Sequence, residues 1–103
     1  MNLDRIFDAL ASAPRRAVLA WLSEGPLHTA ELAERARMSA PAMSRHLSVL
    51  ENAGLVASRR DGQRVLYSLV HDTLMDALSG FAAGLTPAAL ARAEDLQVKR
   101  EAI

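Results

Sequence analysis

The segment from Ser39 to Gly54 constrains the fold most, because its residues specify a short helix together with both of its ends. Ser39 is a favourable N-cap, and Pro41 falls in the first turn, where its missing N–H costs little. Gly54 provides a stop at the C-terminal end. One side of the predicted helix is apolar and is formed by Met43, Leu47 and Leu50.

Two strands are predicted directly after this helix, from Leu55 to Arg60 and from Arg64 to Val70. They flank Asp61-Gly62, a dipeptide that favours a tight hairpin turn because both residues tolerate positive φ. The tip of the hairpin is therefore ringed by three basic residues, Arg59, Arg60 and Arg64.

Three further helices are predicted before residue 39. Apolar residues at i, i+3, i+4 and i+7 indicate the first, namely Leu3, Ile6, Phe7 and Leu10. Pro14 restarts the pattern for a second helix, which Gly25-Pro26 ends. Thr29 is the expected N-cap of a third helix that ends near Met38.

A fifth helix is predicted after the hairpin by Leu74, Leu78, Phe81 and Leu85, which repeat at i, i+4, i+7 and i+11. Thr86-Pro87 is expected to cap a sixth helix that carries Leu90 and Leu96. Residues 1–103 are thus predicted to form a single, mainly α-helical domain with a two-stranded β-hairpin. The apolar stripe of the fifth helix is expected to form a seam between subunits, since helices two to four already supply a core.

The outer side of the helix after Ser39 suits the major groove of double-stranded DNA. Five residues, Ala40, Pro41, Ala42, Ser44 and Ser48, are slim enough to let the helix approach the base edges, and Arg45 is long enough to read them. The order of helix, turn, helix and basic hairpin therefore predicts a winged helix-turn-helix protein.

The charge distribution agrees with a DNA partner. The whole chain has 12 basic and 12 acidic residues, and thus no net charge. Residues 35–64, however, hold six arginines against Glu51 and Asp61, which gives a local charge of +4. The basic hairpin can reach phosphates or the adjacent minor groove.

The composition excludes several other chemistries. The chain has no cysteine, so disulfides, thiolate metal sites, Fe–S clusters and a cysteine nucleophile are ruled out. It contains no nucleophile elbow and no Gly-rich phosphate loop, so neither an enzyme nor a cofactor is predicted.

The longest uncharged stretch, residues 77–91, is too short and too interrupted for a membrane span. No signal-peptide pattern opens the sequence. A cytoplasmic protein is therefore expected.

Four segments resemble the ArsR family of winged-helix transcriptional repressors: 8–19, 31–35, 38–56 and 60–64. The most specific part is Ser-Arg-His-Leu at 44–47 followed by Ala-Gly-Leu-Val at 53–56. The resemblance extends over about residues 3–80. It implies a homodimeric repressor, with helices within 1–12 and 72–100 at the dimer interface, the helix after Ser39 in the major groove, and the hairpin as wing.

The residues and the resemblance together predict two surfaces. The expected partners are an inverted-repeat operator in double-stranded DNA and a second copy of the chain. The candidate DNA-binding residues are Arg16, Ser39, Ala40, Pro41, Ser44, Arg45, His46, Ser48, Arg59, Arg60 and Arg64. The candidate dimer-interface residues are Leu3, Ile6, Phe7, Leu74, Leu78, Phe81 and Leu85.

The sequence departs from the metal-sensing members of the family. Those members carry a paired-cysteine motif leading into the third helix, where this chain has His28 and Ala30; a histidine near a helix cap is the better interpretation of His28. A second family site uses acidic and His ligands along the fifth helix, but His71, Asp72 and Asp76 are followed by no later histidine. We therefore expect no bound metal and no metal response through either site, while an intersubunit site at these three residues stays open.

Alternatives remain for some residues and for the protein as a whole. His46 lies about 60° from the centre of the apolar face, so bracing of the helix competes with a phosphate contact, and bracing is favoured. Arg15 and Arg16 open a helix, where a phosphate contact or a salt bridge to Asp8 or Glu24 would account for them. The alternative function is a winged-helix module that docks to another protein and binds DNA only weakly.

Overall fold

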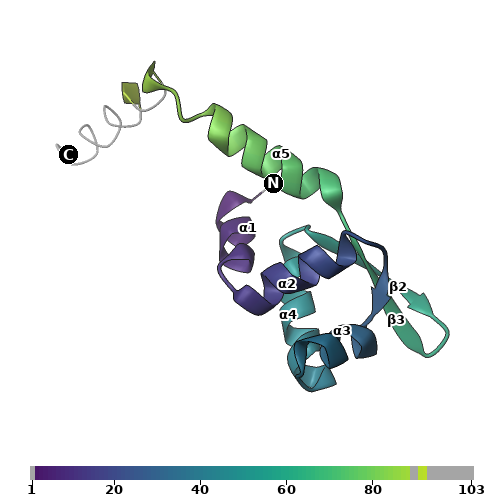
Figure 1. The fold of residues 1–103 in the computed structure, drawn as a ribbon. Coiled ribbons are helices and arrows are strands. Elements are labelled where there is room, and N and C mark those ends of the chain that lie inside the picture. The colour runs from purple at the N-terminus through teal and green to yellow at the C-terminus, as the bar shows by residue number, and fades with distance from the viewer. Residues whose placement is uncertain (1, 89–90, 93–103) are drawn as a thin grey trace.

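The computed structural model describes residues 2–88 and 91–92. In this part of the chain four helices precede a β-hairpin and a further helix follows it (Figure 1). The elements in chain order are α1 (Leu3–Leu10), α2 (Ala13–Leu22), β1 (Leu27–His28), α3 (Thr29–Ala36), α4 (Ala40–Asn52), β2 (Val56–Asp61), β3 (Arg64–Leu69) and α5 (His71–Ala83). This mainly helical fold confirms the predicted winged helix-turn-helix, with α3 and α4 as the two helices and β2–β3 as the wing.

The ends of α4 are those that the sequence predicts. Ser39 Oγ accepts a hydrogen bond from the backbone N–H of Ala42 (3.2 Å), which satisfies a donor at the helix start. Pro41 stands in the first turn. Gly54 follows the helix with a φ of 77°, a left-handed conformation that glycine adopts without a clash at Cβ.

The core lies between the first four helices and the base of the wing. Three of its fully buried side chains, Met43, Leu47 and Leu50, come from α4, which confirms the predicted apolar face of that helix. The other large, fully buried side chains come from α1, α2, α3 and the start of the wing: Ile6, Val18, Leu32 and Leu55.

The start of α3 differs from the prediction. Thr29 is the first residue of the helix, and the N-cap is His28. Glu31 Oε1, in the first turn, accepts a hydrogen bond from the backbone N–H of His28 (3.0 Å). His28 also belongs to β1, which the sequence did not predict because a strand of two residues has no periodicity.

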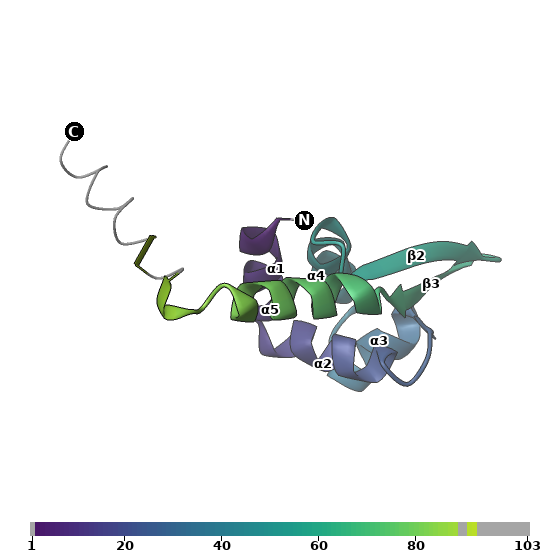
Figure 2. The ribbon, with the colours of Figure 1, turned by 90° about the horizontal axis from the view of Figure 1, so that it is seen from above.

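The three strands form an antiparallel sheet in the order β1-β3-β2. β2 and β3 pair from Val56↔Leu69 to Asp61↔Arg64, whereas β1 pairs only with Leu66 and Tyr67. Residues 60–65, here called the outer wing, therefore extend beyond β1 and project from the helices (Figures 1 and 2).

The turn of the wing lies one residue later than predicted. It consists of Gly62 and Gln63, because Asp61 and Arg64 already form the last pair of the ladder. Gly62 has a φ of 66°. Glycine at the first of two turn residues is typical of a type II′ turn, which joins strands of the normal twist.

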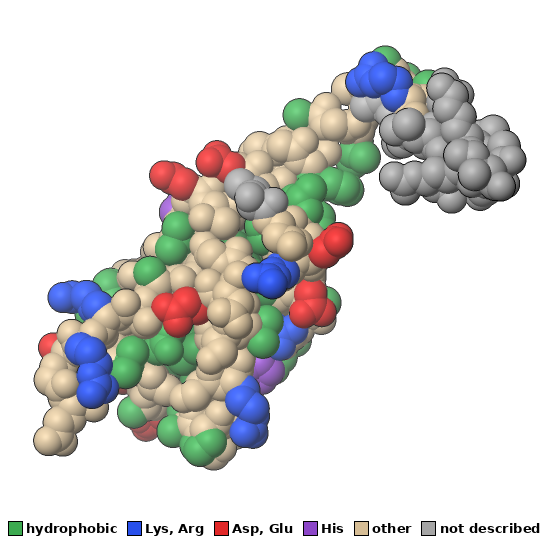
Figure 3. Space-filling view, turned by 180° about the vertical axis from the view of Figure 1, so that it is seen from behind, with side chains coloured by type: hydrophobic (Ala, Val, Ile, Leu, Met, Phe, Trp, Pro, Cys, Tyr) green, Lys and Arg blue, Asp and Glu red, His purple; other side chains and the backbone are tan. Residues whose placement is uncertain are grey.

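Helix α5 carries an apolar surface. It runs along one side of the helices, and residues 84–88 project away from them (Figures 1 and 2). The rings of Phe7 and Phe81 meet edge to face with centroids 5.1 Å apart. Figure 3 shows hydrophobic side chains along this projecting part. Among the described residues, the large apolar side chains that are at least 38% exposed are Leu3, Phe7, Met75, Leu78, Phe81 and Leu85.

Two residues predicted at the dimer interface, Ile6 and Leu74, contribute to the core of the protomer instead. Ile6 is fully buried within the protomer, so it belongs to the core and has no surface left for a partner. Leu74 is half-buried and packs against the same core.

Leu85 lies just after α5, which ends at Ala83. Residues 87–88 and 91–92 are helical where a sixth helix was predicted, and Leu90 and Leu96 lie outside the described residues.

The turn between α3 and α4 contains a residue in a strained conformation. Arg37 has a φ of 55° and a ψ of 46°, in the left-handed region. Its N–H donates to the carbonyl of Glu34 (3.1 Å), and the N–H of Met38 donates to that of Ala33 (3.1 Å). These bonds close the end of α3, but a side chain at this φ brings Cβ too near the following carbonyl oxygen.

Arg37→Gly is expected to stabilise the domain by roughly 0.5–1 kcal/mol. Relief of the left-handed strain is worth about 1–2 kcal/mol, and the greater freedom of glycine in the unfolded chain offsets about 0.4–1 kcal/mol of it. The measurement is the free energy of unfolding in denaturant. Arg35→Gly, in the last turn of α3, is the control and should destabilise by about 1 kcal/mol. A lower unfolding midpoint for Arg37→Gly than for the wild type would contradict the strain argument.

Candidate nucleic-acid interface

The side of α4 that the sequence predicts to face DNA is the side exposed to solvent. Its apolar side is fully buried, and the opposite side is open to solvent. The exposed residues on that side are Ala40, Pro41, Ser44, Arg45 and Ser48, whereas Ala42, also predicted to belong to it, is half-buried. Ser39, just before the helix, is exposed as well, although its hydroxyl is engaged as the N-cap. The result is a slim helix surface from which one long basic side chain extends.

Two side-chain contacts hold α4 against its neighbours. Arg15 Nη1 of α2 donates to His46 Nδ1 (3.3 Å), since a guanidinium can only donate. Ser58 Oγ of β2 donates to Glu51 Oε2 near the C-terminal end of α4 (2.6 Å). The first contact supports the bracing role favoured for His46, and the second joins α4 to the base of the wing.

Arg15 and Arg16 cap the end of α1 instead of forming the salt bridges considered from the sequence. Arg15 Nε donates to the carbonyl of Ala9 (2.8 Å), and its Nη2 donates to that of Asp8 (3.0 Å). Arg16 Nη1 donates to the carbonyl of Leu10 (2.8 Å). The last carbonyls of a helix lack partners within it, and cations are favourable at that end of the helix dipole. Both arginines are therefore accounted for without a nucleic acid.

The predicted basic residues of the wing surround its tip. Arg59, Arg60 and Arg64 are all exposed, and Figure 3 shows basic side chains beside the projecting wing. A hollow of about 250 Å³ has Ala40 on its wall together with Gln63 and Arg64. The start of α4 and the tip of the wing therefore border the same depression.

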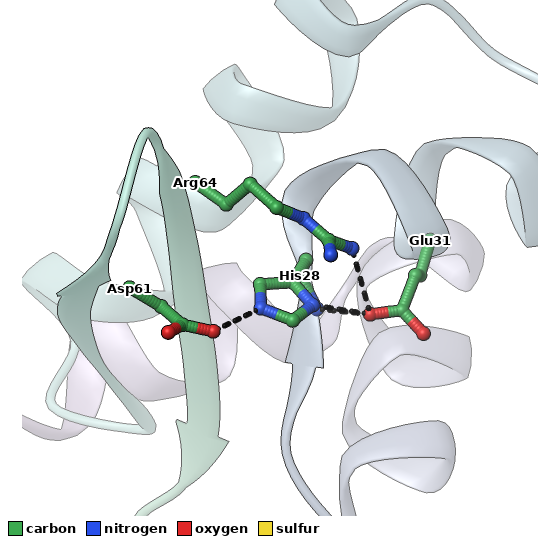
Figure 4. Close-up of polar contacts among 4 residues, drawn as sticks. All are labelled: His28, Glu31, Asp61 and Arg64. Atoms are coloured by element: carbon green, nitrogen blue, oxygen red, sulfur yellow. Dashed lines mark hydrogen bonds and ion pairs between the residues drawn. The ribbon is translucent and has the colours of Figure 1, made fainter.

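His28 connects the outer wing to α3, as Figure 4 shows. Its Nδ1 lies 2.6 Å from Glu31 Oε1, and its Nε2 lies 2.7 Å from Asp61 Oδ2. Arg64 Nη2 lies 3.6 Å from the same oxygen of Glu31. The side chain of His28 is only 16% exposed, against 42% for Glu31 and 55% for Asp61. These four residues are called the His28 cluster below.

The contacts within the His28 cluster favour the charged form of its titratable members. The hydrogen bond to Asp61, followed by that to Glu31, raises the pKa of His28 above its ordinary value of 6.5, against burial and the charge of Arg64. Hydrogen bonds from the backbone and then the side chain of His28 lower the pKa of Glu31. The side-chain hydrogen bond from His28 likewise lowers the pKa of Asp61.

The sequence did not reveal two features of this surface. The spacing of His28 and Glu31 is a signal for the contact at the helix start, but nothing local links His28 to Asp61, 33 positions later. Arg37 was counted within the basic segment without a role, although it is exposed in the turn directly before α4.

The residues considered for an intersubunit metal site lie on α5. His71, Asp72 and Asp76 are all exposed. Within residues 2–88 and 91–92, no three His, Cys, Asp or Glu side chains are grouped so that they could hold a metal ion. None of the helices in this described part is long and apolar enough to cross a membrane.

The chain matches a family of bacterial regulators. Residues 13–58, from α2 into β2, match the model described as bacterial regulatory protein, arsR family. The chain is 47% identical over 66 residues to an HTH-type transcriptional regulator of Mycobacterium tuberculosis, which covers 64% of this chain and 62% of the relative. It is 31% identical over 77 residues to the transcriptional repressor SdpR of Bacillus subtilis, which covers 75% of this chain and 86% of the relative. The match thus spans less than two thirds of the first relative and most of the second.

Solved structures of the same architecture are similar over most of the domain. A crystal structure of an ArsR family transcriptional regulator has a TM-score of 0.72 and 32% identity, and the match covers 79% of this chain and 89% of the other. A solution structure from Mycobacterium bovis has a TM-score of 0.65 and 29% identity, covering 78% and 76%. It is described as the homodimeric winged helix-turn-helix DNA-binding domain of a possible ArsR-family transcriptional regulator.

Proposed function

The chain belongs to the ArsR family of bacterial regulatory proteins, and from this premise we propose that it is a homodimeric repressor that binds an inverted-repeat operator in double-stranded DNA. The observation that carries the proposal is the exposed side of α4, where small residues surround Arg45 and the basic wing tip borders the same hollow as the start of the helix. Such a repressor blocks transcription by occupying its operator, and it would do so in the cytoplasm.

Helix α4 supplies the reading element in this proposal. The major groove of B-DNA is about 12 Å wide and admits an α-helix, provided that the side chains facing the bases are short. Ala40, Pro41, Ser44 and Ser48 meet this condition. Arg45 then extends toward the base edges, where its guanidinium suits the O6 and N7 atoms of guanine.

The wing supplies phosphate anchors. Arg59, Arg60 and Arg64 are exposed on the projecting hairpin, and a guanidinium fork matches the geometry of a phosphate. Ser39, Arg16 and His46 already have partners within the protein, so we assign them supporting roles at the edge of the DNA surface.

A second copy of the chain is the expected cover for the apolar surface of α1 and α5. Leu3, Phe7, Leu78 and Phe81 are each more than a third exposed, and burial of apolar surface is worth about 25 cal/mol per Å². A two-fold axis between two copies would present two α4 helices to the same face of the DNA. The half-sites of the operator should then lie about 10–10.5 base pairs apart, centre to centre.

Arg45→Ala is expected to weaken operator binding by roughly 1–3 kcal/mol per half-site and to relax the preference at one base pair, because a bidentate contact with a base is lost. Arg60→Ala should weaken specific and nonspecific DNA alike and lower the salt slope by about one unit per subunit. Both variants are to be titrated with DNA from upstream of the protein's own gene and with a scrambled duplex over a salt series. Arg92→Ala removes the same charge outside α4 and the wing; as the matched control it should bind like the wild type, once sedimentation shows that the variant is still a dimer.

The assignment of base reading to Arg45 and phosphate anchoring to Arg60 is wrong if Arg45→Ala lowers the affinities for the operator and the scrambled duplex equally, while Arg60→Ala alters only the preference among sequences. The same titrations test the alternative function. A protein interaction module that binds DNA weakly would show the same low affinity for both duplexes, and Arg45→Ala would then change no sequence preference.

Leu78→Glu is expected to give a monomeric or aggregated protein, because a carboxylate would be buried at a symmetric interface. Ser79→Glu adds the same charge to the side of α5 roughly opposite the buried Ala77, and it should remain dimeric. Sedimentation at micromolar concentration measures the assembly, and circular dichroism confirms folding. A well-folded wild-type monomer under these conditions would rule out the proposed dimer.

A further inference from the structure

We propose that protonated His28 clamps the outer wing to the helix-turn-helix, so that DNA binding by this protein is coupled to the uptake of a proton. The inference rests on the proposed function and deepens it, because it names a residue that positions the DNA-binding surface and the condition under which it does so. His28 acts here through Asp61, Glu31 and Arg64.

The geometry of His28 requires both of its ring nitrogens to donate. Nδ1 and Nε2 each lie within hydrogen-bond distance of a carboxylate oxygen, at 2.6 and 2.7 Å. An ionised carboxylate can only accept hydrogen bonds, and a neutral imidazole has a single N–H. The two contacts are therefore satisfied together only when His28 is an imidazolium.

The outer wing has few other connections to the rest of the domain. β1 pairs with Leu66 and Tyr67 only, so the backbone ladder to the body stops before the outer wing begins. The contact between Glu51 and Ser58 likewise lies at the base. Within the described part of the chain, the side-chain hydrogen bonds and ion pairs that join the outer wing to the body are those between His28 and Asp61 and between Glu31 and Arg64.

The protonation of His28 also sets the charge beside the proposed phosphate anchors. With His28 protonated, its charge and that of Arg64 balance the two carboxylates, and the His28 cluster is neutral. Loss of the proton leaves the cluster with one negative charge. The charge of Arg59 also lowers the pKa of Asp61, but Arg59 is itself a proposed phosphate anchor and is not counted in the His28 cluster. A deprotonated cluster therefore repels the phosphates and holds Arg64 more strongly at Glu31.

The direction of the pH effect follows by linkage. In the free protein the carboxylates raise the pKa of His28 above 6.5. Phosphates that approach Arg64 and the wing add negative charge nearby, which raises the pKa of His28 further. Between these two pKa values the complex holds a proton that the free protein has lost. Operator affinity should therefore fall as the pH rises through this interval, by up to about tenfold per pH unit for each protomer.

The clamp also has a consequence in the absence of DNA. Its contribution to stability through His28 is fully present below pH 6.5 and is lost as the pH rises through the folded pKa. Its contribution through Glu31 and Asp61 is present above their ordinary pKa values of 4.5 and 3.8, and is lost as the pH falls through their lowered folded values. The clamp therefore stabilises the domain most between about pH 4.5 and 6.5.

The experiment compares the wild type with His28→Gln, which removes the titratable ring, and with His71→Gln as the matched control. His71 is an exposed histidine on α5, outside the His28 cluster. Proton NMR measures the pKa of His28 in the free full-length protein. Operator affinity and the midpoint of thermal unfolding are measured from pH 5.5 to 8.5 at constant ionic strength.

The expected result has three parts. The pKa of His28 lies above 6.5, and Asp61→Asn lowers it. Operator affinity of the wild type and of His71→Gln falls at alkaline pH, whereas His28→Gln shows a nearly flat profile. The unfolding midpoint of the wild type declines above pH 6.5 relative to that of His28→Gln.

A pKa of His28 at or below 6.5, or a His28→Gln variant that keeps the wild-type dependence of affinity on pH, would overturn the proposal. Strong operator binding that is independent of pH would count against the coupling and leave the proposed function in place. Failure of the wild type to bind its upstream DNA even at pH 6 would count against the proposed function itself. The pKa and the unfolding profile would in that case still report whether the clamp exists.

Discussion

The burial of one side of α4 is the constraint on which the rest of the structure depends. Met43, Leu47 and Leu50 are fully buried, and together they determine the rotation of the helix about its own axis. A rotation by one residue, about 100°, would expose leucine and bury serine hydroxyls without partners. The presentation of Arg45 and Ser48 to solvent is therefore a consequence of hydrophobic packing. The helix that forms the centre of the core is thus also the one proposed to read the DNA.

The sequence predicted those parts of the fold that neighbouring residues determine. Ser39, Gly54 and the apolar spacing between them define α4, because caps and periodicity act within a few residues. The hairpin was predicted, but its turn was placed one residue early, since Gly62 fits either turn position and strand pairing decides between them. The contact of His28 with Asp61 joins residues 33 positions apart, and strand β1 pairs with Leu66 and Tyr67, which are still farther along the chain, so no local pattern exists for either. The exposure of Ser44, Arg45 and Ser48 followed from the helical periodicity, whereas the contacts of the candidates with DNA stay predictions.

A chain without net charge can present a basic surface because its arginines have different tasks. Arg15 and Arg16 donate hydrogen bonds to the last carbonyls of α1 and so cap the end of that helix. Arg59, Arg60 and Arg64 stand exposed on the wing. Acidic residues near the wing would weaken this surface, but Glu31 and Asp61 both face His28. A count of charges along the sequence gives all these arginines the same weight. The contacts in the structure separate the arginines that complete a helix end from those exposed on the wing.

The choice of histidine at the clamp follows from geometry. The two carboxylates belong to different elements and approach the ring from the α3 side and from the wing side (Figure 4). An imidazolium carries one N–H on each side of a small rigid ring, whereas the donors of a glutamine amide share a single nitrogen and those of a lysine share one flexible ammonium. A short bridge between two opposed carboxylates therefore favours histidine. Its second N–H exists only in the protonated form, so sensitivity to pH is a consequence of the same geometry that positions the wing.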